Sequence, residues 1–198
     1  MRPLATAGGL LLLVTLLATC NPGDRAVPTD LRGSTALAAP SASVVAPPAQ
    51  NFDAHLSGDD EVPARDTRGQ GELKLQLNAA GDTLEYKIIS SNIYNVVQSH
   101  IHIAPAGING SIVVFLYGLV PAGGGRTDGV LASGIITAGN LIGPLAGHPL
   151  SDLIRLIRHD SAYANVHTND GVDGTNTGPG DFPGGEIRGQ VRALGPKP

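Results

Sequence analysis

Residues 71–90 read GELKLQLNAAGDTLEYKIIS, and apolar and polar side chains alternate on both sides of a short turn. In the first half every second residue from 73 to 77 is leucine, and in the second half Leu84, Tyr86 and Ile88 share one face. Such alternation is typical of a strand with one buried face. Because the Ala-Ala-Gly-Asp segment between the halves favours a turn, the stretch predicts a β-hairpin.

Six further segments combine β-branched, aromatic or leucine residues with flanking Gly, Asn or Pro, and each predicts a strand. They are residues 51–58, 99–103, 111–118, 129–137, 162–168 and 185–193. Short strands separated by turn residues favour an all-β fold, and we expect a Greek-key β-sandwich. Residues 51–194 are long enough to form one such domain around a single core.

One segment, HPLSDLIRLIRHD at residues 148–160, departs from the strand pattern. Its apolar side chains follow helical spacing: Leu150, Leu153, Ile154 and Ile157. Ser151 is the expected N-cap, and Arg155 and Arg158 lie towards the end, where cations suit a helix. The segment predicts one short amphipathic helix that covers an end or an edge of the sandwich.

The N-terminal residues have the composition of a secretory signal. A single charge at Arg2 precedes a leucine-rich run at residues 10–18, which is shorter than a membrane span of roughly 20 apolar residues. Leu17-Ala18-Thr19-Cys20 resembles the bacterial lipobox, which implies a signal peptide over residues 1–19 and lipidation of Cys20, although Thr19 replaces the usual small residue. An ordinary signal peptide and an uncleaved N-terminal anchor are the alternatives. We expect export across the cytoplasmic membrane and a lipid anchor in the cell envelope.

The remaining composition limits the partners. Residues 20–50 are rich in Pro, Ala and Ser and predict a flexible linker after the anchor cysteine, and residues 195–198 form a short tail. The chain has 17 acidic against 13 basic residues, which argues against nucleic acid, so the expected membrane contact is through Cys20 alone. Since Cys20 is the only cysteine, no disulfide within the chain is possible.

Two histidines one residue apart mark the stretch QSHIHIAP at residues 98–105. On a strand, His100 and His102 share a face with Cβ atoms roughly 6.5–7 Å apart, while Ile101 and Ile103 point towards the core. Two imidazoles at that spacing can converge on one Zn or Cu ion. The alternative is structural, with the rings hydrogen-bonded to backbone carbonyls to hold a loop.

Four blocks of the chain together resemble the chordin-type (CHRD) domain. In order, they are residues 52–88, 99–118 (SHIHIAPAGINGSIVVFLYG), 162–168 (AYANVHT) and 182–191 (FPGGEIRGQV). This family occurs in bacterial extracytoplasmic proteins and, repeated, in the animal extracellular protein chordin, which binds growth factors. The resemblance implies an all-β extracellular domain and does not specify an activity.

A more distant resemblance is to copper/zinc superoxide dismutases, where a His-x-His pair and a later histidine ligate copper. Carried over by position, the ligands here are His100, His102 and His167, and the fold is an immunoglobulin-like or dismutase-like sandwich. His167 lies in NVHT and shares a strand face with Tyr163 and Asn165. His55, Glu61 or Glu186 are further candidate ligands. The chain lacks a zinc loop with a bridging histidine, a disulfide pair and a matching arginine.

The sequence therefore leaves three functions open. The first is a tethered, non-enzymatic extracytoplasmic module that binds a protein or another surface ligand. The second is a Cu- or Zn-binding protein, and the third is a metal-dependent redox enzyme. No G-x-S-x-G, H-E-x-x-H, P-loop or dinucleotide motif is present, so no other enzyme class is indicated.

Overall fold

The computed structural model describes residues 50–172 and 178–194. The predicted signal peptide at residues 1–19, the lipidation of Cys20, the linker before residue 50 and the tail at 195–198 lie outside the described residues. In the described part of the chain, no helix has the length and apolar character needed to span a membrane.

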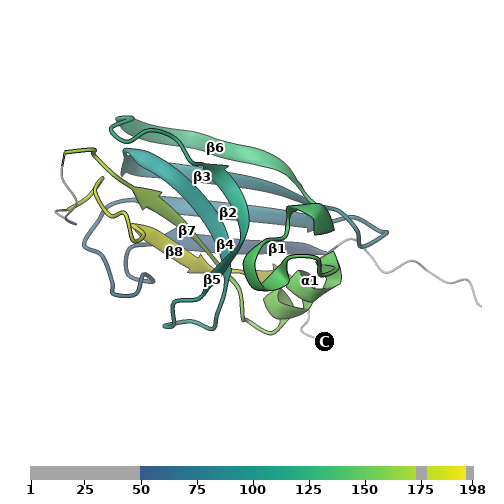
Figure 1. Cartoon of the computed structure of the whole chain (residues 1–198). Coiled ribbons are helices and arrows are strands. Elements are labelled where there is room, and N and C mark those ends of the chain that lie inside the picture. Colours follow the sequence, from purple (N-terminus) through teal and green to yellow (C-terminus); the bar gives the residue numbers. More distant parts are fainter. Residues whose placement is uncertain (1–49, 173–177, 195–198) are drawn as a thin grey trace, which may run out of the picture. The chain divides into compact units, whose positions relative to one another are not determined.

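Over these residues the chain forms nine strands, one α-helix and two 3-10 helices (Figure 1). The strands are β1 (Asn51–Ser57), β2 (Gln70–Leu77), β3 (Leu84–Tyr94), β4 (Val96–Ile103), β5 (Ser111–Gly118), β6 (Arg126–Ile136), β7 (Tyr163–Thr168), β8 (Ile187–Gln190) and β9 (Arg192–Leu194). The helices are η1 (Ala138–Asn140), η2 (Gly143–Leu145) and α1 (Leu150–Arg158). The prediction of an all-β fold with one short α-helix is confirmed.

The strands are antiparallel and hydrogen-bonded in the order β5-β4-β7-β8-β1-β2-β3-β6, with β9 also paired to β1. The two halves of this order are joined where β8 meets β1 by the single residue pair Ser57–Arg188. The two expected layers are thus connected into one curled, nearly closed sheet. The edge strands are β5 and β6, and the Tyr86 hydroxyl of β3, the neighbour of β6, donates to the carbonyl of Leu116 in β5 at 2.8 Å.

The interior of the curled sheet is a single apolar core. Alternate residues of the predicted hairpin point inward, so Leu73 and Leu84 are fully buried. Helix α1 adds Leu153 and Ile157 at one end of the sheet (Figure 1). The helix begins at Leu150 with Pro149 as N-cap, so the prediction of Ser151 as N-cap is wrong. Leu150 is itself buried, so the helix begins with the first residue of its apolar stripe.

Strand β4 lies between β5 and β7 and is covered on both faces. Ile101 is fully buried in the core, and Ile103 packs against it. His100 and His102 therefore point to the outer face, as predicted. Two connections, residues 104–110 and residues 178–186, lie over this outer face, because their carbonyls reach the histidine rings.

Candidate metal centre

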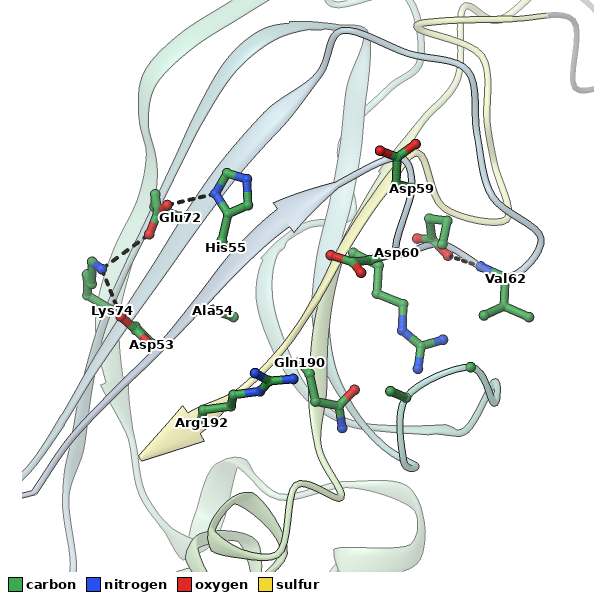
Figure 2. Close-up of a pocket in the computed structure, with 14 residues that line it drawn as sticks. Asp53, Ala54, His55, Asp59, Asp60, Val62, Glu72, Lys74, Gln190 and Arg192 are labelled. Carbon is green, nitrogen blue, oxygen red and sulfur yellow. Dashed lines mark hydrogen bonds and ion pairs between the residues drawn. The ribbon is translucent and has the colours of Figure 1, made fainter. Parts of the chain in front are cut away.

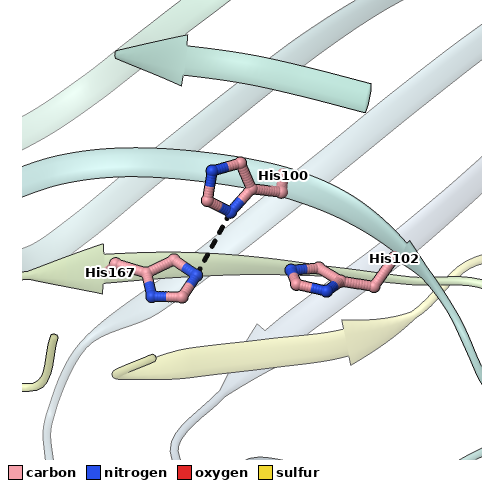
Figure 3. A group of neighbouring side chains, drawn as sticks. All are labelled: His100, His102 and His167. Atoms are coloured by element: carbon pink, nitrogen blue, oxygen red, sulfur yellow. Dashed lines mark hydrogen bonds between the residues drawn. The ribbon is translucent and has the colours of Figure 1, made fainter. Parts of the chain in front are cut away.

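Three histidines from two neighbouring strands meet on the outer face of the sheet (Figure 3). His100 and His102 come from β4 and His167 from β7, and one ring nitrogen from each lies within 4.8 Å of the others. Their exposed fractions are 0%, 7% and 7%. The three residues proposed from the sequence are thus brought together.

Strand register explains this convergence. Asn165 of β7 lies directly opposite His100, and His167 is two residues further along the same face. Diagonal neighbours on adjacent antiparallel strands are within reach of long side chains. Because Ala164 and Val166 point into the core, the alternation of β7 turns His167 outward, towards the histidines of β4.

Backbone carbonyls fix the orientation of two rings. His167 Nδ1 lies 2.8 Å from the carbonyl oxygen of Pro183, and His102 Nδ1 lies 2.9 Å from that of Gly110. A carbonyl only accepts, so each Nδ1 carries the proton and each Nε2 keeps its lone pair. Metal-ligating histidines are oriented in this way by a backbone carbonyl or carboxylate on the other nitrogen.

His100 is the third member of the group. Its Nδ1 donates to His167 Nε2 at 3.2 Å, while its Nε2 is buried without a hydrogen-bond partner. Two nitrogens bound to one ion at about 2.0–2.1 Å in tetrahedral geometry stand roughly 3.3 Å apart. His100 Nδ1 and His167 Nε2 already have this spacing. His100 would therefore hold the ion through Nδ1, with its proton moved to the unpartnered Nε2.

The rings are held in the neutral form that metal binding requires. Burial lowers the pKa of His100 to about 3, and the neighbouring His167 and His102 add to this effect. Burial also lowers the pKa of His102 and that of His167, although their carbonyl partners act in the opposite direction. At neutral pH each ring therefore offers a lone pair.

Aromatic rings enclose the histidines. The ring of Phe115 on β5 meets His100 edge-on, with centroids 4.5 Å apart, and Tyr163 stacks on His102 at 4.7 Å. The Arg188 guanidinium covers the other face of Tyr163 at 3.4 Å from its centroid. The histidines thus face outward from the sheet but are shielded from water.

Arg188 also holds the connection that orients His102. It donates to the side chain of Asn109 and to the carbonyls of Pro105 and Ile108. Glu186, a further candidate ligand, accepts hydrogen bonds from Thr67, Thr168 and the amide of Gly180 and lies outside the histidine group.

The other candidate ligands lie outside the histidine group. His55 on β1 is exposed and pairs with Glu72 at 2.8 Å. Glu61 is buried, with an exposed fraction of 5%, and stands beside Asn165. Asn165 contacts His102 Nε2 through its side-chain amide at 3.0 Å. Sequence alternation placed Tyr163 and Asn165 on the face of His167 but gave them no role.

A separate groove of about 730 Å³ runs along β1 beside the ends of β8 and β9 (Figure 2). Figure 2 shows a chain of ion pairs on one side, in which Lys74 bridges Asp53 and Glu72. Asp59 and Asp60 lie across from it in Figure 2, and Glu61 also lines the groove. The groove is mixed in charge and holds no group of metal ligands among the described residues.

Comparison with known proteins gives one match. The family model described as the CHRD domain matches residues 52–191, which cover the whole of the sheet up to β8. No curated protein and no solved structure matches the chain.

Proposed function

The chain belongs to the CHRD-domain family, and we propose that it is a metal-binding member in which His100, His102 and His167 hold one Cu or Zn ion. Membership of this family supports a structural or binding module. In this proposal the ligand of the module is a metal ion, bound on the outer face of the sheet.

One observation carries the proposal. Three buried histidines converge, with one ring nitrogen of each within 4.8 Å of the others, and carbonyls orient two of the rings through Nδ1. Burial keeps the rings neutral by lowering their pKa values, that of His100 to about 3. In a purely structural cluster every buried ring nitrogen would have a hydrogen-bond partner, whereas His100 Nε2 has none.

Three neutral imidazoles suit Cu and Zn, and a three-ligand site keeps one coordination position for water or another ligand. We propose binding as the primary role. A metal-dependent redox enzyme is a separate possibility, and it requires turnover of superoxide or peroxide by the metal-loaded form alone.

Purified protein is expected to bind about one equivalent of Cu or Zn. Replacing both His100 and His102 with alanine should abolish binding, because a single imidazole remains. Metal content measured by mass spectrometry of the dialysed protein tests this, with His55→Ala as the matched control because His55 lies outside the group. Absence of metal after reconstitution, or equal loss in the control, would contradict the proposal.

A second candidate is a module that binds a protein or another surface ligand without metal. The charged groove favours it, since acidic and basic side chains line one concave surface (Figure 2). The two candidates separate in the metal measurement: a protein that stays metal-free after reconstitution supports this one.

We also propose that the domain is extracytoplasmic and is tethered to the membrane through lipidated Cys20, as the N-terminal sequence indicates. Cys20→Ser removes the only thiol, so the variant should leave the membrane fraction of a bacterial host and become soluble. Fractionation followed by immunoblotting measures this shift. A variant that stays with the membrane as the original protein does would show that another element is the anchor.

A further inference from the structure

A buried carboxylate stands immediately behind the histidine group. Glu61 accepts a backbone hydrogen bond from Val62 at 3.2 Å through Oε2, while its Oε1 is buried without a hydrogen-bond partner. An unpartnered, buried carboxylate oxygen costs free energy unless something compensates for it. Asn165 approaches this carboxyl, and Arg188 and Arg65 act on it through their charges.

Glu61 lies beside Asn165 and Gly185. A Cβ atom at residue 185 would overlap the Glu61 carboxylate and come within 3.2 Å of Asn165 Nδ2. Gly185 also adopts a φ of 119°, which other residues rarely tolerate. The missing side chain thus makes room for the carboxylate and the amide to lie side by side.

Asn165 connects the carboxylate to the metal ligands. Asn165 Oδ1 lies 3.0 Å from His102 Nε2, and the same side chain lowers the pKa of Glu61 through a hydrogen bond. An amide presents an acceptor on one side and two donors on the other, so the NH₂ group is the end that faces Glu61. A cation bound beside His102 would polarise this amide and strengthen its N–H as a donor to Glu61.

Nearby cations are already engaged elsewhere. Arg188 donates to Asn109 and to two backbone carbonyls, and Arg65 donates to the carbonyl of Gly185. Burial raises the pKa of Glu61, although the charges of Arg188 and Arg65 act against this. A further positive charge beyond Asn165 would favour the ionised carboxylate.

We infer that Glu61 is the buried countercharge of the metal site and that it acts through Asn165 to favour divalent over monovalent cations. This inference rests on the proposed metal-binding function. Three neutral imidazoles leave a divalent ion with its full charge in a buried place, and such charges require compensation. Glu61 is a positioning residue, since it does not touch the ion.

The test compares Zn²⁺ with Ag⁺ in the full chain carrying Glu61→Gln. The variant keeps the shape of the side chain and removes a buried charge, so it is expected to fold. Loss of an outer-shell partner should weaken Zn²⁺ binding by about tenfold to a hundredfold. Because the Coulomb energy scales with ion charge, Ag⁺ binding should weaken by only about threefold to tenfold.

Competition titrations with a chromophoric chelator give both affinities. Asp60→Asn is the matched control, because Asp60 is the exposed neighbour that lines the same groove, and it should change neither affinity. Glu61→Asp retains the charge and should keep the Zn²⁺ to Ag⁺ ratio of the original chain, even if both affinities fall.

The outcomes separate the two proposals. If the original chain binds neither cation, the proposed function fails and this inference with it. If the original chain binds Zn²⁺ and Glu61→Gln binds both cations equally well or loses equal factors for both, the inference alone is overturned. A collapse of the ratio in Glu61→Asp, where the charge remains, would overturn it as well.

Discussion

Lowering the pH from 7 to 5 is expected to destabilise the metal-free protein by about 2 kcal/mol through His100 alone, and His102 and His167 act in the same direction. Burial lowers the pKa of His100 to about 3 and lowers those of His102 and His167, whereas an unfolded histidine has a pKa near 6.5. Below pH 6.5 the unfolded chain therefore binds protons that the folded chain excludes. The stability is fully present above this pH and falls as the pH approaches the folded values.

The loss through His100 alone is a substantial part of the stability of an ordinary domain, about 5–15 kcal/mol. Glu61 opposes it, since a raised pKa stabilises the folded state as the pH falls, but it is one group against three. Urea unfolding in the presence of a chelator, repeated across pH 7 to 5, measures the slope. His100→Gln should remove the share that His100 contributes, about 2 kcal/mol between pH 7 and 5, and His159→Asn, at an exposed histidine, should leave the slope unchanged. A free energy of unfolding that is constant over this range would show that the three rings take up protons in the folded state as they do in the unfolded chain.

The face on which the histidines lie could be predicted because it depends on local alternation. Ile101 is buried in the core, so its neighbours His100 and His102 must point the other way. The same rule applied to Ala164 and Val166 turns His167 outward. What brings the two strands together is pairing between residues more than sixty positions apart, which local alternation does not reveal, and His167 was named through the resemblance to superoxide dismutases.

Burial of the site could not be predicted from alternation. His55 also points outward from its strand, yet it is exposed, whereas His100 has no exposed surface. The difference comes from residues 104–110 and 178–186, which return over one part of the outer face and not over the other. No definite role could be assigned to Glu61 from the sequence for the same reason, because it contacts Gly185, which lies more than a hundred residues further along the chain.

Glu186→Gln should destabilise the protein by about 3 kcal/mol, because one carboxylate serves three donors in a fully buried place. Its oxygens accept from the hydroxyls of Thr67 and Thr168, each at 2.6 Å, and from the amide of Gly180 at 2.8 Å. The hydroxyls donate to Glu186 because a carboxylate only accepts, and each hydroxyl also accepts a backbone N–H, from Gly69 and Phe182 respectively. An amide at this position turns one acceptor into a donor that faces another donor.

The same substitution should loosen the metal site. Glu186 fastens residues 178–186, and the carbonyl of Pro183 in this connection orients His167. Chemical denaturation measures the loss of stability, with Glu85→Gln on the exposed face of β3 as the control that should change it by less than about 0.5 kcal/mol. Zn²⁺ affinity, measured below the unfolding transition, should fall in Glu186→Gln and not in the control. Unchanged stability would mean that the three donors find other acceptors, and unchanged affinity would mean that Pro183 is held independently of Glu186.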